Sequence, residues 1–309
     1  MKNIVNVINL PKVSVIIPTY GGSNSLKRAI ESVLEQNYGN FNIIVVDDND
    51  PMTQARKQTE KIMKHFEGNS QVIYIKHDKN KNASAARNTG VKATDAKYLC
   101  LLDDDDLFLK NRIVHQVDFL EKHTEFQACY CWRIQNGKMI CGIEEGDLTK
   151  SLLDLSFTPT TSAIMLTKNS YDSLNGFDET YRRHQDYEFL IRFFKKFKMG
   201  VVPEVLLRFE GNEVDNQLYG KKLYELKKHF FSQFKDEIEL IESNNTGYKK
   251  RVYASHFATA CIQLLKKGNF FLALKMYFEY GVEGGLRFWS MFFSKTVSGV
   301  FRKFKNLIK

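Results

Sequence analysis

The 309-residue sequence has little of what marks fibrous, disulfide-rich or membrane-spanning proteins. Its five prolines and 18 glycines are too few for a collagen-like or low-complexity chain. It has no window of ~18 uncharged apolar residues, the length that a spanning helix needs. Its first residues lack a small-residue cleavage site after an apolar region. We therefore expect a folded cytoplasmic chain of about two domains.

Paired cysteines are also lacking. Cys100, Cys129, Cys131, Cys141 and Cys261 are odd in number and scattered, without C-x-x-C spacing. This pattern predicts reduced thiols rather than a disulfide framework or a zinc site.

Excess basic charge is absent from the first two thirds of the chain and concentrated in the last third. Residues 1–220 carry 28 Lys and Arg against 29 Asp and Glu, whereas residues 221–309 carry 17 against 7. A basic block of this kind is typical of proteins that bind nucleic acid or an anionic membrane. Because the acidic run Asp103–Asp106 would repel phosphates unless a metal ion intervened, we expect a membrane surface and no nucleic acid.

The hydrophobic pattern of residues 13–210 predicts strands that alternate with helices. Strands are expected at 13–20, 42–50, 71–77 and 97–106, and helices at 25–37, 53–66 and 83–93. The alternation indicates an α/β fold with an open, mostly parallel sheet. Short strands from about 126 to 166, around the turn Asn136-Gly137, predict an antiparallel addition. A helix over 184–197 and a strand over 200–210 complete this domain.

A domain boundary is predicted near residue 212, with a basic helical region over 213–309. Residues 248–280 are expected to form a helical hairpin about Lys267–Asn269. Residues 286–309 predict an amphipathic helix whose cations lie mostly opposite an apolar stripe, as in interfacial helices. The stripe comprises positions 288, 292, 293, 297, 300, 301, 304 and 308. Packing of the stripe onto the domain, or against a second copy, is the alternative, because Gly299 and Thr296–Ser298 weaken helix propensity.

Four consecutive aspartates, Asp103–Asp106, end a predicted strand at the sheet edge where Asp47 and Asp48 are also expected. Neighbouring carboxylates repel one another, and a divalent cation relieves that repulsion. An oxygen-only donor set suits Mg²⁺ or Mn²⁺, held by Asp103 and Asp105 with a substrate diphosphate completing the shell. An acidic turn that caps the next helix is the alternative.

Five segments, in this order, resemble the motifs of the family 2 glycosyltransferases, which are inverting enzymes with a GT-A fold. They are VSVIIPTY, VVDDND, NASAARNTG, LLDDDD and GFDETYRRHQDYEFLIR, within residues 11–210. The resemblance implies that residues 1–212 form a GT-A, Rossmann-like catalytic domain that transfers a sugar from a nucleotide, with UDP favoured, using Mn²⁺ or Mg²⁺. It implies that the acceptor is a hydroxyl group of a cell-surface glycan, a teichoic acid, or a lipid-linked or glycoprotein molecule. It also implies that the enzyme encounters this acceptor at the cytoplasmic face of the membrane. A homo-oligomer is compatible with it.

The resemblance also implies roles for individual residues. The nucleotide contacts map onto Pro18, Thr19, Tyr20, Asp48, Arg87, Asp103 and Asp104. The metal contacts map onto Asp103 and Asp105, with Asp105 as the more direct ligand. The general base that deprotonates the acceptor hydroxyl maps onto Asp186. His184, Gln185 and Glu210 are expected near the acceptor or the sugar.

Three positions depart from the family pattern. The usual N-x-G reads Asn80-Lys81-Asn82, Gln185 replaces a Glu before Asp186, and the R-x-H motif ends in Glu210. Glu210 either replaces the histidine as a hard oxygen ligand or the metal contact is lost. These departures leave open a degenerate member that binds nucleotide without catalysis. A sugar nucleotidyltransferase is a third interpretation, disfavoured because no G-x-G-x-x-[RT] loop follows the first strand.

Overall fold

The computed structural model describes residues 10–158, 160–210 and 220–307, with side chains up to Thr296. Two compact units make up the chain, Met1–Thr149 with Pro159–Gly211 and Lys150–Thr158 with Asn212–Lys309. Residues 150–158, which the sequence places in the first domain, thus group with the helices of the second unit.

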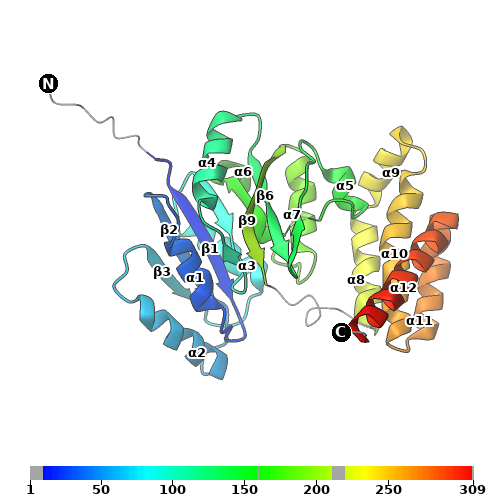
Figure 1. Ribbon diagram of the computed structural model, residues 1–309, viewed down its shortest axis with the longest axis horizontal. Helices are drawn as coiled ribbons and strands as arrows, with labels where there is room; N and C mark the ends of the chain where they lie inside the picture. Colours follow the sequence, from blue (N-terminus) through cyan, green and yellow to red (C-terminus); the bar gives the residue numbers. More distant parts are fainter. Residues whose placement is uncertain (1–9, 159, 211–219, 308–309) are drawn as a thin grey trace. The chain divides into compact units, whose positions relative to one another are not determined.

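The first unit is built on a mixed sheet of nine strands (Figure 1). The strands are β1 (Val13–Thr19), β2 (Phe41–Asp47), β3 (Val72–Lys76), β4 (Tyr98–Leu101), β5 (Leu107–Phe108), β6 (Ala128–Gln135), β7 (Lys138–Ile140), β8 (Ile164–Thr167) and β9 (Met199–Phe209). Their order is β3-β2-β1-β4-β8-β6-β9-β5, with β7 paired to β6. The first four strands in this order are parallel, and β8 adds the first antiparallel pair. This α/β architecture confirms the predicted fold class, including the antiparallel addition.

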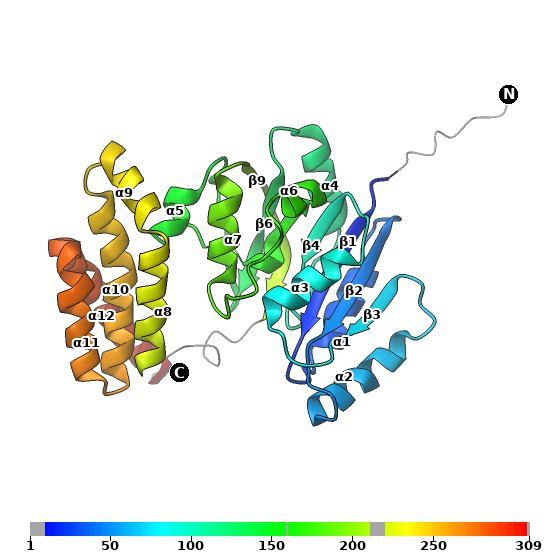
Figure 2. The same cartoon turned by 180° about the vertical axis from the view of Figure 1, so that it is seen from behind.

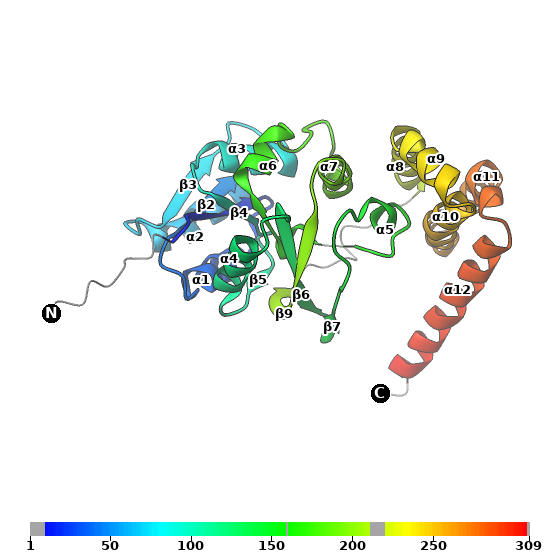
Figure 3. The same ribbon diagram turned by 90° about the horizontal axis from the view of Figure 1, so that it is seen from above.

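Helices cover both faces of this sheet, as the crossover connections require. They are α1 (Leu26–Leu34), α2 (Gln54–Met63) with the 3₁₀ turn η1 (Lys64–Phe66), α3 (Ala83–Lys92), α4 (Arg112–Lys122), α6 (Lys168–Ser173) and α7 (Gln185–Phe194), with a 3₁₀ turn η2 at Thr161–Ala163. Seen from above, α1 and α4 lie on one face, and α3, α6 and α7 on the other (Figure 3). The reverse view shows the α3 face directly (Figure 2).

Alternate side chains of β1 supply the two halves of the core, because successive residues of a strand point to opposite faces. Val13, Val15 and Ile17 belong to the cluster that packs under α1 and α4. Ile16 points to the other face, under α3. The strand predicted at 97–106 ends earlier, at Leu101. The acids after it turn away from the ladder and remain at the sheet edge.

Gly90 allows α3 to lie close against β1. A Cβ at this position would come 2.4 Å from Cγ2 of the buried Ile16 and 3.3 Å from Cγ2 of Val46. We expect Gly90→Ala to lower the free energy of unfolding by about 1–3 kcal/mol through overpacking. Chemical denaturation measures the free energy of unfolding of the variant and of the parent protein. Gly39→Ala, whose new methyl group would meet nothing closer than 3.8 Å, is the control and should leave stability within about 0.5 kcal/mol.

The second unit is helical. It contains α5 (Thr149–Leu153, from Lys150 onward), α8 (Gly220–Gln233), α9 (Lys235–Asn244), α10 (Tyr248–Lys266), α11 (Phe270–Met276), the turns η3 (Tyr277–Gly281) and η4 (Val282–Gly284), and α12 (Gly285–Leu307). The predicted hairpin corresponds to α10 and α11 joined at Lys267–Asn269. Residues 150–158 are fixed by His256 of α10, whose Nε2 lies 2.8 Å from the Leu153 carbonyl oxygen.

The apolar stripe predicted for residues 286–309 is partly used for packing. Phe288 is 1% exposed and packs against Tyr277, with their ring centroids 5.0 Å apart. Trp289 and Phe293 remain exposed. Positions 297, 300, 301, 304 and 308 lie outside the described side chains. Among the described helices, none is long and apolar enough to cross a bilayer.

Candidate active site

The parallel strands β1, β2 and β4 lie side by side, so their carboxyl ends meet at one edge of the sheet. Thr19 ends β1 opposite Asp47, which ends β2. The aspartates Asp103–Asp106 follow β4 at the same edge. Binding sites of open α/β sheets lie at this edge. The fold therefore brings together most of the positions that the sequence analysis selected.

Asp48 anchors the loop that precedes α3. Its carboxylate accepts hydrogen bonds from the backbone N–H groups of Lys81 (2.8 Å) and Asn82 (2.9 Å) and from the Asn80 side chain (2.9 Å). The Nδ1 atom of His77 lies 2.7 Å from Oδ1 of Asp48. Asp48 is 3% exposed, so these protein partners surround the carboxylate. The departure at Asn80-Lys81-Asn82 thus leaves this loop firmly attached.

Asp47, beside it, is held inside the protein. Its carboxylate forms an ion pair with Arg56 Nε at 3.0 Å and accepts hydrogen bonds from Tyr74 (2.6 Å) and the Asn49 side chain (2.7 Å). Arg56 is also buried and donates to the His77 carbonyl oxygen. This network fixes the ends of β2 and β3, which carry the site.

We expect Arg56→Met to destabilise the protein by about 3–5 kcal/mol, because it leaves the Asp47 carboxylate buried without its cation. Urea unfolding measures the change. Lys76→Met removes the exposed ion pair with Glu60 and serves as the control, with an expected cost below about 1 kcal/mol. Equal costs for the two variants would contradict the structural role of Arg56.

Three of the four consecutive aspartates have protein partners. The Thr19 hydroxyl donates to Asp104, Arg87 pairs with Asp103 at 2.6 Å, and Asp106 accepts from the backbone N–H of Glu210 at 3.0 Å. Burial, with repulsion from neighbouring aspartates, raises the pKa values of Asp104 and Asp106 to about 7. A raised pKa means that the ionised carboxyl is disfavoured in the folded protein. When its four carboxyls are ionised, the cluster carries more negative charge than Arg87, which pairs with Asp103, can balance.

Asp105 has the donor chemistry of a cation ligand. Burial and then the charge of Asp103 raise the pKa of its carboxyl, and Glu210 adds to the effect. Glu210 is thus near this carboxyl, although its own carboxylate pairs with Arg28 at 2.8 Å. Oxygen donors with unbalanced negative charge fit Mg²⁺ or Mn²⁺. In the part of the chain described, no set of three His, Cys, Asp or Glu side chains is placed to hold an ion.

Arg87 presents unused hydrogen-bond donors to the site. It lies on α3, 4% exposed, with its guanidinium 5.5 Å from the centre of the Phe177 ring. Asp103 occupies one terminal nitrogen, whereas Nε and the other terminal nitrogen have no partner among the described residues. A buried donor without a partner is costly, so this geometry is suited to an anionic or carbonyl oxygen of a ligand.

Asn88, which the sequence analysis did not select, connects α3 to the loop before α7. Its side-chain oxygen accepts from Tyr171 and from the Phe177 N–H, and its NH₂ donates to the Phe177 carbonyl and to Glu179. All four hydrogen-bonding positions of the amide are used. Asn82 attaches to the same loop through the Glu179 carbonyl oxygen. The only sequence signal for these residues was their place in the segment NASAARNTG.

Asp186 lies in the first turn of α7, one residue after the helix begins at Gln185. His184 precedes the helix with φ of +58°, a left-handed conformation that turns the chain into it. Burial raises the pKa of the Asp186 carboxyl, while the Arg87 cation lowers it and Asp103 raises it. These electrostatic effects place Asp186 close to the aspartate cluster.

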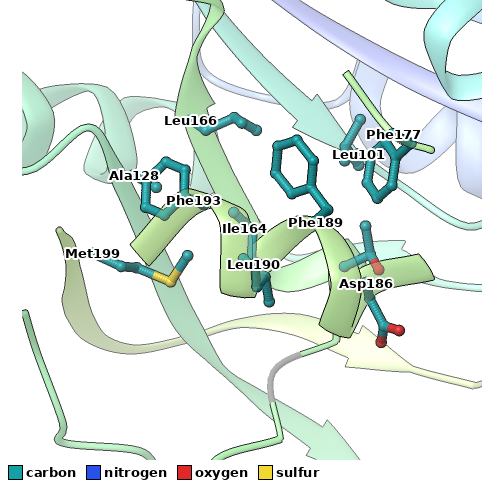
Figure 4. Close-up of a pocket in the computed structure, with 11 residues that line it drawn as sticks. Leu101, Ala128, Ile164, Leu166, Phe177, Asp186, Phe189, Leu190, Phe193 and Met199 are labelled. Carbon is teal, nitrogen blue, oxygen red and sulfur yellow. The ribbon is translucent and has the colours of Figure 1, made fainter. Parts of the chain in front are cut away.

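Apolar side chains of α7 and of the sheet lie beside Asp186. They line a cavity of about 10 Å³, enough for about one water molecule. Figure 4 shows the Asp186 carboxylate pointing away from the labelled aromatic and aliphatic groups. The carboxyl group thus has apolar side chains on one side, and its oxygens point away from them.

The remaining predicted positions lie at the same edge. Pro18 pairs with Val46 within β1 and β2, and Tyr20, immediately after β1, is 61% exposed. Gln185 and His184 are half-buried at the start of α7.

Comparison with known proteins agrees with this architecture. Residues 14–139 match the glycosyl transferase family 2 domain. An uncharacterized glycosyltransferase of Methanocaldococcus jannaschii is 28% identical over 235 residues, which are 73% of this chain and 80% of that protein. The amylovoran biosynthesis glycosyltransferase AmsB of Erwinia amylovora is 28% identical over 212 residues, 63% of this chain and 68% of its own. The chain covers between 23% and 63% of the length of four similar glycosyltransferases from Rickettsia species.

A solved structure extends the likeness beyond the matched domain. S. aureus TarS 1-349 in complex with UDP-GlcNAc superposes with a TM-score of 0.59 over 93% of this chain and 92% of that one, at 15% identity. This likeness concerns the fold. The matched domain places residues 14–139 in glycosyl transferase family 2, and the relatives show that the chain is similar to glycosyltransferases over most of its length.

Proposed function

We propose that this protein is a metal-dependent inverting glycosyltransferase that moves a hexosyl group from a nucleotide-sugar, with UDP as the favoured nucleotide, to an acceptor hydroxyl. The observation that carries the proposal is the grouping of Arg87, Asp103, Asp105 and Asp186 at one sheet edge, where Arg87 offers unused donors and Asp105 unbalanced charge. A donor with two phosphates and a positive metal ion complements both.

The nucleotide is assigned to the ends of β1, β2 and β4. β1 ends here with Pro18 and Thr19, and Tyr20 follows directly. Asp48 holds the loop before α3. The Arg87 guanidinium donates to the nucleotide, and Asp103 and Asp104 border it. The UDP-GlcNAc complex of S. aureus TarS supports UDP as the nucleotide. It does not identify the sugar, which depends on a few side chains of the pocket.

Asp103 and Asp105 would hold Mn²⁺ or Mg²⁺, with Glu210 as a third oxygen ligand once it leaves Arg28. When bound, the ion stabilises negative charge on the leaving diphosphate. Arg87 adds fixed positive charge at the same place, because it is buried and held by Asp103.

Asp186 acts as the general base. Its carboxylate takes the proton of the acceptor hydroxyl while that oxygen attacks the anomeric carbon and the bond to the diphosphate breaks. One displacement inverts the configuration at that carbon. A raised pKa makes a carboxylate a stronger base, which suits this role. His184 and Gln185 lie on the approach of the acceptor, at the start of α7.

The acceptor is assigned to the class of cell-surface glycans, including teichoic acids and lipid-linked or glycoprotein glycans. AmsB, a relative named for amylovoran biosynthesis, supports a polysaccharide. We further propose that the enzyme works in the cytoplasm at the inner membrane face, where cations of residues 286–309 attract anionic lipid. A homo-oligomer remains part of this proposal.

The function is tested by incubating the protein with Mn²⁺ and a set of UDP-hexoses in the presence of glycan acceptors, and measuring UDP release. We expect one UDP-sugar to be consumed, with release abolished by chelation of the metal. NMR of the product should show an anomeric configuration opposite to that of the donor. Retained configuration would overturn the inverting mechanism, and UDP release that is unaffected by chelation would overturn metal dependence.

A further inference from the structure

The second unit exposes large apolar side chains on one side of its helices. Phe271 is 92% exposed, Leu286 is 90%, and the other members are half or more exposed. These others are Phe270, Leu274, Phe278, Val282 and Phe293. Scattered apolar residues are normal on a surface, but aromatic side chains that gather on α11 and the start of α12 need a partner.

A groove lies among these side chains, between α10, α11 and α12. It has a volume of about 400 Å³ and is lined by apolar and aromatic residues alone. The lining includes Cys261 of α10, Leu274 of α11 and Trp289 of α12. Trp289 stacks on Phe293 with ring centroids 5.9 Å apart, so an aromatic wall continues along α12. The lining contains no charged side chain, and its polar side-chain groups are the Tyr277 hydroxyl, the Trp289 indole N–H and the Cys261 thiol.

The segment that carries most of the apolar surface has more basic than acidic residues. Residues 264–296 carry five Lys and Arg against two Glu. Lys266 and Arg287 are exposed, and in the sequence Lys266 precedes Phe270 by four residues while Arg287 directly follows Leu286. One of the two acids, Glu279, is engaged by the Tyr224 hydroxyl and by Lys275. An apolar surface with a positive rim complements an anionic lipid layer, because the tails meet the aromatics and the head groups meet the cations.

We propose that the groove between α10, α11 and α12 takes acyl chains of an anionic phospholipid leaflet. This is a defined insertion site, distinct from attraction of the basic residues 297–309 to the membrane surface. Charge favours lipid over a second copy of this chain, because two such positive rims would repel each other.

Fluorescence tests the site directly. The chain has two tryptophans, and Trp132→Phe leaves Trp289 in the groove as the single reporter. With phosphatidylglycerol vesicles we expect a blue shift of Trp289 emission and quenching by lipids brominated on their acyl chains. With phosphatidylcholine vesicles both changes should be weak. Unchanged emission with anionic vesicles would overturn the proposal.

Substitutions separate the groove from the basic tail. Phe271→Gln with Leu286→Gln should lower partitioning into anionic vesicles at least about tenfold, since two nearly fully exposed side chains are altered without affecting the core. Leu240→Gln, an exposed leucine of α9 in the same unit, is the matched control and should bind normally. Circular dichroism verifies folding of all variants.

Two outcomes would contradict the proposal. Undiminished binding of the double variant, together with loss of binding on changing Arg302, Lys303 and Lys305 to Gln, would assign membrane contact to the tail alone. Absent vesicle binding, with a dimer in sedimentation that the double variant abolishes, would identify a second copy as the occupant. None of these readouts depends on sugar transfer, so their result is independent of the proposed activity.

Discussion

Asp186→Asn is expected to lower kcat for sugar transfer by about 10²–10⁴-fold, the usual contribution of a general base. Asparagine has nearly the same shape but cannot take the proton of the acceptor hydroxyl. The affinity for UDP with metal should be unchanged, because the change affects the chemical step. Steady-state kinetics and calorimetric titration of UDP measure the two quantities.

The pH profile provides a second readout of the same residue. Only the ionised form of Asp186 works as a base, so activity should fall as the pH is lowered through its pKa. Burial raises that pKa above the ordinary value for aspartate, and the acid limb should lie correspondingly higher. Asp172→Asn, at an exposed acid of α6, is the control and should leave the rate and the profile unchanged. A normal rate for Asp186→Asn would exclude it as the base.

Asp105→Asn is expected to remove the dependence of UDP binding on Mn²⁺ and to lower kcat/KM at least about 100-fold, because several kcal/mol of charge stabilisation are lost. The substitution also relieves repulsion within the acidic cluster, so the protein without metal should be as stable as the parent or more so. Calorimetric titration of UDP with and without Mn²⁺ distinguishes loss of the metal from loss of the fold.

Asp118→Asn is the matched control for this experiment, because Asp118 is an exposed acid of α4 paired only with Lys122. It should retain full Mn²⁺ dependence. If Asp105→Asn also retains it, the ion is held elsewhere or is not used. Glu210→Gln then tests the second oxygen donor, since Glu210 lies near Asp105 and at present pairs with Arg28.

The sequence predicted the sheet well because its strands are continuous buried runs. In β1 and in β2 five of the seven residues are apolar, a pattern that parallel strands covered on both faces produce. The end of β4 was predicted too late, because periodicity does not reveal where a strand stops pairing and a turn of aspartates begins. The packing of Lys150–Thr158 with the second unit was also missed, since it depends on contacts such as that between His256 and Leu153.

Motif order located the candidate site but did not separate residues that face a ligand from residues that hold the site. Asp47 and Asp48 are adjacent and chemically alike, yet Asp47 is enclosed by Arg56 and Tyr74 while Asp48 carries the loop before α3. Asn88 was not selected because an asparagine beside an arginine has no distinctive spacing. Only the fold shows that its amide connects α3 to the loop that leads to Asp186.

The most direct test of the proposed function is the thermal stability of the purified protein with UDP, GDP, CDP and TDP, each with and without Mn²⁺. A ligand at 100 times its Kd adds about 2.7 kcal/mol of stability, which is readily measured as a rise in Tm. We predict a rise with UDP that requires Mn²⁺ and disappears in Asp105→Asn. Unchanged Tm with all four nucleotides, in the presence of Mn²⁺, would contradict a metal-dependent nucleotide site at the acidic edge of the sheet.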